Sequence, residues 1–384
     1  MLSKSILFQN FKIKTNLKSL KNKLKNILKR NNEVINSLGK NYKNNFESKK
    51  LKKKYNSTNF RVIGMGGSIL GTKAIYDFLE KKIKKKFIFF DNLKIIKKKF
   101  NKKNFTNIII SKSGNTIETI VNSSILIGKN DKNIFVTENK NNYLNVLAQK
   151  LKSEVVHHND YIGGRYSVLS EVGMLPAELM DLKIKNFKQL NNVVKSKNFT
   201  NTLIKNVGAI LNLIYRKKYN SIILNYDEYS ESLFKWYQQL IAESLGKKRK
   251  GILPVISSMP KDNHSLMQLY LDGNQNNFFT FFYVHEKNSP KINNNFIIAK
   301  DKIFKNKNVS EIIYSQKKAT ENVFNNQNIP FRSFELNRRD EKTLGELFCF
   351  FILETILLAE CLKINPFDQP AVELIKKETK RILI

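Results

Sequence analysis

The sequence has little cysteine and histidine. Its 384 residues include two cysteines and four histidines, with no Cys/His cluster that could hold a metal ion. Cys349 and Cys361 lie twelve residues apart in one apolar helical pattern. This separation is about 18 Å along a helix axis, too far for a disulfide. We therefore expect no metal site, and two unpaired cysteines fit a reduced, cytoplasmic protein.

Long hydrophobic runs are also missing. The longest apolar run, 347–353, is bounded by Glu346 and Glu354, which predicts a buried helix and not a membrane span. Residues 1–14 lack the sustained apolar core of a signal peptide. We therefore expect no membrane partner.

Acidic residues are too few to balance the basic ones, and the formal net charge is +36. Such an excess suggests nucleic acid as a partner. However, lysine is spread with asparagine and isoleucine over the whole chain, whereas a nucleic-acid footprint is clustered and interleaved with aromatic residues. The lysine runs at 81–86 and 97–103 lie between apolar strand candidates and are predicted to be solvated helix ends and loops. We expect no nucleic-acid partner, and nucleic-acid binding stays an alternative that rests on charge alone.

The order of apolar segments predicts an α/β fold. Residues 1–55 have a few apolar positions at helical spacing and are predicted to form a helical arm. Beyond them, strand candidates alternate with helical patterns, which is typical of parallel sheets with helices on both faces. We predict a first unit at 56–200, with strands at 60–63, 87–90, 107–110, 133–136 and 154–157. We predict a second unit at 201–384, with strands at 221–225, 253–256, 278–284, 295–299 and 330–336, a helix at 343–362 and a last helix from Pro370.

The segment 111–119 is predicted to bind an anion. It follows the apolar run 108–110 and leads into an amphipathic helical pattern. The free N–H groups and the dipole of a helix N-terminus favour negative charge, and hydroxyl side chains add donors. Because this segment has no Walker lysine pattern and no dinucleotide fingerprint, it indicates a small phosphorylated metabolite.

A second turn, at 64–71, follows the first strand of the same unit and contains Gly67 and Ser68. Loops after neighbouring parallel strands line one crevice at their carboxyl ends, so this turn and the anion loop are expected to face the same ligand. The glycine spacing does not match the dinucleotide pattern, and a nucleotide site stays an alternative.

Four further segments carry residues suited to chemistry. Arg165 follows two glycines and supplies a fixed cation. Gln239 and Glu243 are four residues apart and share a helix face. His264, near a predicted helix start, is either structural or a proton carrier, and Lys376 lies in the final helix.

Taken in this order, the segments resemble the glucose-6-phosphate isomerase family, also called phosphoglucose isomerases. The resemblance runs from about residue 58 to 380 and is carried by segments 163–173, 243–247, 264–270 and 367–376. It implies two sugar-isomerase subdomains, each a parallel sheet flanked by helices, in a homodimer. It also implies the interconversion of glucose 6-phosphate and fructose 6-phosphate in glycolysis and gluconeogenesis, with no metal or organic cofactor.

The same resemblance implies a role for each matching residue. Glu243 matches the base that moves a proton between C1 and C2, and Arg165 matches the cation beside the enediolate. His264 and Lys376 match the pair that opens the sugar ring, with His264 coming from the partner subunit. The residues that match phosphate-loop and other substrate contacts are Gly67, Ser68, Ser111, Lys112, Ser113, Thr116, Thr119, Gln239 and Gln369.

Independently of the resemblance, the chemistry of an aldose–ketose exchange requires these residue types. One carboxylate must take a proton from one carbon and return it to the other. Fixed positive charge must face the developing oxyanion. The phosphate group supplies remote binding energy that holds the sugar in register.

Two segments depart from the family pattern. Gly and Asn at 114–115 occupy the middle of the anion loop, where the family more often has bulkier residues, and 259–261 differs before His264. The first departure leaves open a bifunctional phosphoglucose/phosphomannose isomerase. A non-catalytic phosphosugar-binding protein is a further alternative, against which the presence of Glu243, Arg165 and Lys376 argues.

Overall fold

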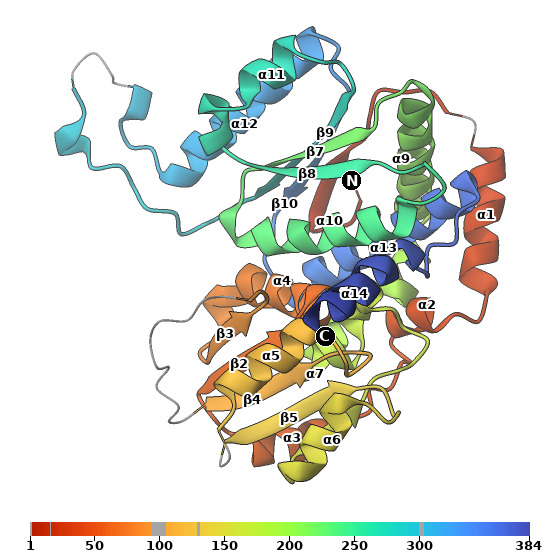
Figure 1. Ribbon diagram of the computed structural model, residues 1–384. Coiled ribbons are helices and arrows are strands. Elements are labelled where there is room, and N and C mark those ends of the chain that lie inside the picture. Colours follow the sequence, from red (N-terminus) through yellow and green to blue (C-terminus); the bar gives the residue numbers. More distant parts are fainter. Residues whose placement is uncertain (1, 16, 94–104, 129–130, 299–302) are drawn as a thin grey trace.

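Two α/β units are stacked with helices between their sheets (Figure 1). The computed structural model describes residues 2–15, 17–93, 105–128, 131–298 and 303–384. Helices α4 (Leu70–Leu79), α10 (Glu231–Leu245) and α13 (Glu341–Leu362) lie between the two sheets (Figure 1). No helix in these ranges is both long enough and apolar enough to cross a membrane.

The first sheet has the strand order β3-β2-β4-β5-β6, with all pairings parallel. Its strands confirm the five predicted ones: β2 (Asn59–Gly64), β3 (Lys86–Phe90), β4 (Phe105–Ile110), β5 (Lys132–Thr137) and β6 (Glu154–His157). Because the chain passes from β2 to β3 and then returns to the other side of β2, the loops after β2 and β4 flank the switch point of the sheet, where α/β proteins bind ligands.

Side chains of the first sheet alternate between two apolar layers. Val62 and Ile108 pack in the large core that includes Phe78 of α4. Their neighbours Ile63 and Ile109 face the opposite layer. That layer is covered by α5 (Ile117–Leu126) and α6 (Tyr143–Lys150). The alternation buries both faces, as a parallel sheet requires.

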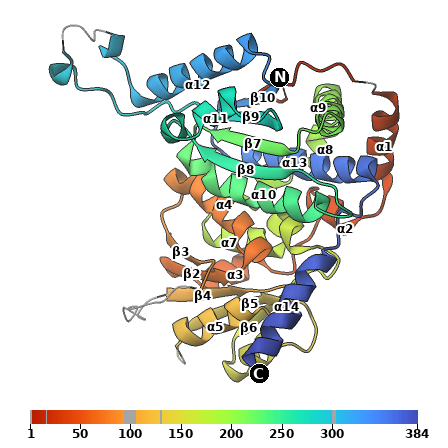
Figure 2. The same ribbon diagram turned by 45° about the horizontal axis from the view of Figure 1, so that its top comes forward.

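The second sheet has the order β1-β10-β9-β7-β8. Its parallel strands are β7 (Asn220–Asn225), β8 (Leu253–Ser258), β9 (Asn277–Val284) and β10 (Phe331–Leu336), which confirms four predictions. One face packs on α9 (Lys197–Tyr215), α10 and α13, and the other on α11 (Met267–Asp272) and α12 (Val309–Asn326). Figure 2 shows α12 on the outer side of this sheet.

The predicted helical arm is only partly helical. It contains α1 (Lys18–Lys29), α2 (Glu33–Ser37) and α3 (Ser48–Lys54), but it begins with β1 (Ile6–Gln9), which pairs antiparallel with β10. The second sheet is therefore mixed. The sequence did not reveal β1, because four residues show no clear period and the partner strand lies more than three hundred residues away. The predicted boundary at residue 200 falls inside α9, and the division into three parts stays a prediction.

The predicted strand at 295–299 was wrong. Residues Asn294–Phe296 form a short 3-10 helix, Phe296 is 84% exposed, and Ala299 lies outside the described residues. β9 pairs directly with β10, so the sheet has no place for a strand between them. In the lysine run at 81–86, residues 81–85 form a helix end and loop, as predicted, whereas Lys86 begins β3. Lys81, Lys82 and Lys85 form ion pairs. The run at 97–103 lies outside the described residues.

A buried lysine ties the arm to the rest of the chain. The ammonium group of Lys188 donates hydrogen bonds to the carbonyl oxygens of Ser37, at 2.6 Å, and Leu169. It also lies 4.6 Å from the centre of the Tyr42 ring. Burial lowers the pKa of Lys188 to about 7.

This pKa predicts how stability changes with pH. Between pH 7 and 9 the unfolded chain keeps Lys188 protonated while the folded chain releases the proton, so the free energy of unfolding should rise with pH. The rise is at most about 1.4 kcal/mol per pH unit. We expect Lys188→Met to remove this part of the slope in urea unfolding at pH 7, 8 and 9, and Lys185→Met, at an exposed position, to keep it. Equal slopes for wild type and Lys188→Met would contradict the prediction.

Candidate active site

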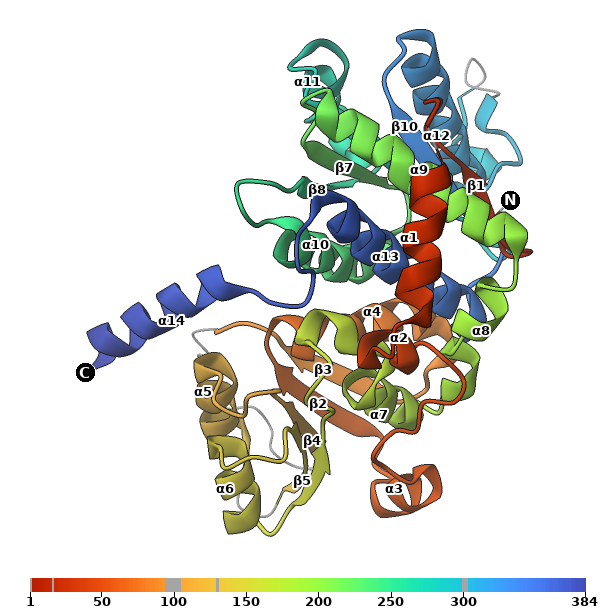
Figure 3. The same ribbon diagram turned by 90° about the vertical axis from the view of Figure 1, so that its right-hand side faces the viewer.

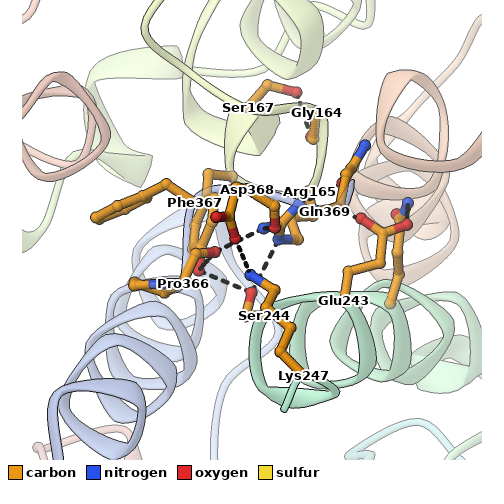
Figure 4. Close-up of polar contacts among 12 residues, drawn as sticks. Gly164, Arg165, Ser167, Glu243, Ser244, Lys247, Pro366, Phe367, Asp368 and Gln369 are labelled. Atoms are coloured by element: carbon orange, nitrogen blue, oxygen red, sulfur yellow. Dashed lines mark hydrogen bonds and ion pairs between the residues drawn. The ribbon is translucent and has the colours of Figure 1, made fainter. Parts of the chain in front are cut away.

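Arg165 lies at the centre of the site (Figure 4). It belongs to the 3-10 helix η3 (Gly164–Leu169), and its side chain is 1% exposed. A guanidinium has five N–H donors, and all five are used here. Nε donates to Ser244 Oγ at 2.8 Å; Nη1 donates to Glu243 Oε2 at 3.2 Å and Gln369 Oε1 at 2.5 Å; Nη2 donates to the carbonyl oxygens of Pro366 at 2.6 Å and Asp368 at 2.9 Å. Arg165 therefore joins η3, α10 and segment 365–369.

Glu243 is held on both sides. Its Oε2 accepts from Arg165, and its Oε1 accepts from Gln239 Nε2 at 2.9 Å, one helical turn earlier on α10. The side chain of Glu243 is 25% exposed, so the carboxylate is oriented but still reachable. Gln239 Oε1 is buried and has no hydrogen-bond partner among the described residues. The predicted pairing of Gln239 and Glu243 on one face is thus observed.

The glycine turn at 64–71 packs against Gln239 and against the backbone next to Arg165. In η1 (Gly66–Ser68), Gly66 has φ +54°, and a Cβ there would lie 2.9 Å from Gln239 Nε2. A Cβ on Gly67 would lie 2.2 Å from the carbonyl carbon of Gly164 and 2.5 Å from the backbone nitrogen of Arg165. Ser68 is buried beside this contact. The absence of a side chain at Gly67 therefore lets the turn after β2 touch the segment that carries Arg165.

The anion loop connects β4 to α5, as predicted. Thr116 is the N-cap residue of α5, and it makes no side-chain capping bond, so the N–H groups of the first turn keep their capacity to bind an anion. Its hydroxyl lies 2.9 Å from that of the buried Ser111, while Ser113 is exposed. Thr119 is buried, and its hydroxyl has no partner among the described residues. Lys112 is not free, because its ammonium lies 3.3 Å from Glu138 Oε1 and donates to the carbonyl of Asp160 at 2.7 Å.

Two predicted site residues lie away from Arg165 in this chain. Lys376 is in α14 (Pro370–Leu383), which has no buried residue and extends away from the rest of the chain (Figure 3), and its ammonium pairs with Glu373 at 2.6 Å. His264 ends the 3-10 helix η6 (Lys261–His264) and is exposed. In the described parts of the chain, neither is hydrogen-bonded or ion-paired with Glu243 or Arg165.

The sequence did not reveal the supporting partners of Arg165. Ser244 also bonds the hydroxyl of Tyr166 at 2.8 Å, and Trp236 Nε1 donates to the carbonyl of Arg165 at 3.0 Å. Burial raises the pKa of Tyr166, which keeps this hydroxyl neutral. Lys247 bonds Asp368 at 2.6 Å and lowers the pKa of that carboxyl group. The sequence signal was that Ser244 and Lys247 lie within segment 243–247, which carries the family resemblance, but it did not show what they contact.

Comparisons with known proteins agree on one family. The family model described as "Phosphoglucose isomerase" matches residues 11–384. A glucose-6-phosphate isomerase of Methanocaldococcus jannaschii is 32% identical over 353 residues, covering 85% of this chain and 84% of the relative. A glucose-6-phosphate isomerase of Mesomycoplasma hyopneumoniae strain 7448 is 31% identical over 351 residues, covering 84% of this chain and 82% of the relative.

Solved structures show the same fold. A hypothetical protein of Thermus thermophilus has a TM-score of 0.84 at 21% identity, covering 96% of this chain and 94% of that one. A glucose-6-phosphate isomerase of Chlamydia trachomatis has a TM-score of 0.69 at 19% identity, covering 88% and 72%. The chain therefore shares its two-sheet fold with these structures. Together with the sequence comparisons, this establishes that the chain belongs to the phosphoglucose isomerase family.

The close contact at Gly67 gives a test of the site geometry. We expect Gly67→Ala to displace η3 and with it Arg165, because backbone atoms cannot avoid the new methyl group. Isomerase kcat/KM should fall about a hundred-fold or more, the size of effect that an ångström-scale misplacement produces. The control is Gly163→Ala, where the added Cβ would meet its nearest atom at 3.8 Å and should change kcat/KM little. Similar activity in the two variants would show that the contact does not position Arg165.

Proposed function

We propose that this protein interconverts D-glucose 6-phosphate and D-fructose 6-phosphate by ring opening and a cis-enediolate, in glycolysis and gluconeogenesis. The observation that carries the proposal is the carboxylate of Glu243, which is fixed between Gln239 and Arg165 while it stays reachable. Family membership and relatives named as glucose-6-phosphate isomerases support the substrate pair.

In the proposed mechanism Glu243 is the base. It takes a proton from C2 of the open aldose and returns it to C1, or the reverse, so one carboxylate serves both carbons. Arg165 supplies fixed positive charge next to Glu243, where the enediolate oxygen develops charge. Gln239 orients the carboxylate, and its free acceptor Oε1 is suited to a sugar hydroxyl. These steps are proton transfers within the sugar, and we propose no cofactor.

The anion loop is proposed to hold the phosphate. Ser111, Ser113, Thr116 and Thr119 supply hydroxyls, and the first turn of α5 supplies N–H groups. Gly67, Ser68 and Gln369 are proposed as further contacts on the basis of the family resemblance. The bound phosphate places the sugar in register with the base.

Ring opening is assigned to His264 and Lys376, again from the family resemblance. His264 is exposed, which is compatible with its completing the site of a partner subunit in a homodimer. Lys376 lies seven residues beyond Gln369, a contact of Arg165, so its helix begins at the edge of the site. We propose a homodimer in the cytoplasm.

The base assignment predicts the effect of Glu243→Gln. The amide keeps the shape of the side chain but cannot accept the proton, so kcat should fall at least about a hundred-fold, within the range for loss of a general base. Fructose 6-phosphate should still bind, as measured by calorimetry. Glu231→Gln, an exposed change in the first turn of the same helix, is the control and should retain activity. Near-full turnover of the Glu243→Gln protein would refute the assignment.

Substrate range is tested separately. We expect a coupled assay to show turnover of fructose 6-phosphate and none of mannose 6-phosphate. Turnover of both would replace the proposal with a bifunctional phosphoglucose/phosphomannose isomerase. Binding of both without turnover would favour a non-catalytic phosphosugar-binding protein.

A further inference from the structure

Four charged side chains form a closed cluster beside the anion loop. Glu138, directly after β5, places Oε1 at 3.3 Å from Lys112 Nζ and Oε2 at 3.0 Å from Lys140 Nζ. Lys140 also lies 3.4 Å from Asp160 Oδ2, and Lys112 donates to the carbonyl of Asp160 at 2.7 Å. Glu138 and Asp160 raise the pKa of Lys140 above its ordinary value. The cluster has two positive and two negative charges.

The backbone fixes Glu138 next to the loop. Its N–H donates to the carbonyl of Lys112 at 3.0 Å, and the preceding Thr137 hydroxyl donates to the same carbonyl at 3.2 Å. Asn142 bonds Thr137 and fills the space above Gly114, where a Cβ would lie 2.0 Å from its Oδ1. Glu138 therefore cannot move away from the loop without separating β5 from it. Its side chain is 12% exposed, so little water screens the carboxylate from Lys112.

A carboxylate in this place opposes anion binding. Lys112 is the only cation between residues 111 and 119, and the proposed function requires that loop to hold a phosphate dianion. Glu138 forms an ion pair with the ammonium group of Lys112, which the phosphate would otherwise contact. The negative charge of Glu138 would also repel the phosphate. Substrate and product of the proposed reaction carry the same phosphate. Tighter binding of that group lowers KM without accelerating chemistry, and it slows release of product.

We propose that Glu138 sets the phosphate affinity of the site by competing with the bound phosphate for Lys112. The proposal deepens the proposed function and rests on it for the identity of the loop as the phosphate site. Glu138 acts through Lys112 and is not itself a catalytic residue. By weakening the binding of the phosphate group, Glu138 keeps KM higher and the release of product faster.

The test uses Glu138→Gln in the full chain. Inorganic phosphate is the probe, with its Kd measured by calorimetry, because this measurement needs no turnover. We expect phosphate to bind about two- to five-fold more tightly than to wild type, the range for one partly exposed ion pair. With fructose 6-phosphate, KM should fall by a similar factor and kcat should not rise. A residue that merely supported the loop would have the opposite effect, and phosphate would bind more weakly.

The route through Lys112 is tested by a double-mutant cycle. We expect Lys112→Met to weaken phosphate binding, and we expect Glu138→Gln to give no tightening in the Lys112→Met background. Glu341→Gln is the matched control: its side chain is 10% exposed and pairs with Lys82 at 2.8 Å, away from the loop, so phosphate affinity should stay at the wild-type value.

The outcomes separate the two proposals. Unchanged or weaker phosphate binding by Glu138→Gln, or the same tightening in both backgrounds, would overturn the role of Glu138. So would a wild-type chain that binds no phosphate. The expected changes in phosphate Kd in a chain that does not isomerise fructose 6-phosphate would uphold the role of Glu138 and overturn the proposed function.

Discussion

The arrangement of the site depends on one buried guanidinium. Arg165 connects three segments that are distant in sequence, and each of its five N–H groups has an acceptor. Removal of Arg165 would leave Glu243, Ser244 and the carbonyl oxygens of segment 365–369 without their shared donor. Buried acceptors that lose a donor are costly, so the loss of Arg165 would weaken the contacts that hold these three segments together. An anion that approaches Arg165 finds no spare donor and has to replace an existing acceptor.

The two sheets must also keep their relative position for this cluster to form. α4 begins at the glycine turn, and Glu243 lies in the last turn of α10, so both helices have one end at the site. At their other ends Ser232 of α10 donates to Asp77 of α4, and nearby the Arg339 side chain bonds Asp227 at 2.6 Å, Glu286 at 2.6 Å and the carbonyl of Phe78 at 3.4 Å. Asp227 follows β7, Glu286 follows β9, and Phe78 lies near the end of α4. The helix pair is therefore held at both ends, which limits sliding between Glu243 and the glycine turn.

Much of the fold could be predicted because its signals are local. Nine of the ten predicted strands were confirmed, since buried parallel strands are short apolar runs followed by helical periodicity. The tenth, at 295–299, was wrong because β9 pairs directly with β10, which leaves no place between them for a strand formed by this apolar run. β1 was missed because its pairing with β10 is entirely non-local and leaves no local signal in the sequence. Residue types at the site were predictable from the chemistry and the family resemblance, as with Glu243 and Arg165.

Partnerships between side chains were much less predictable, and Lys112 shows why. Its sequence neighbours are serines and a glycine, so the sequence presents it as an isolated cation in an anion loop. In the fold, the ends of β4, β5 and β6 lie side by side, and this brings Glu138 and Asp160 to the same ammonium. The net charge around this loop therefore depends on the residues that follow the neighbouring strands as well as on the residues of the loop itself. A count of cations within the loop overstates its net positive charge, since the neighbouring loop contributes a carboxylate at 3.3 Å.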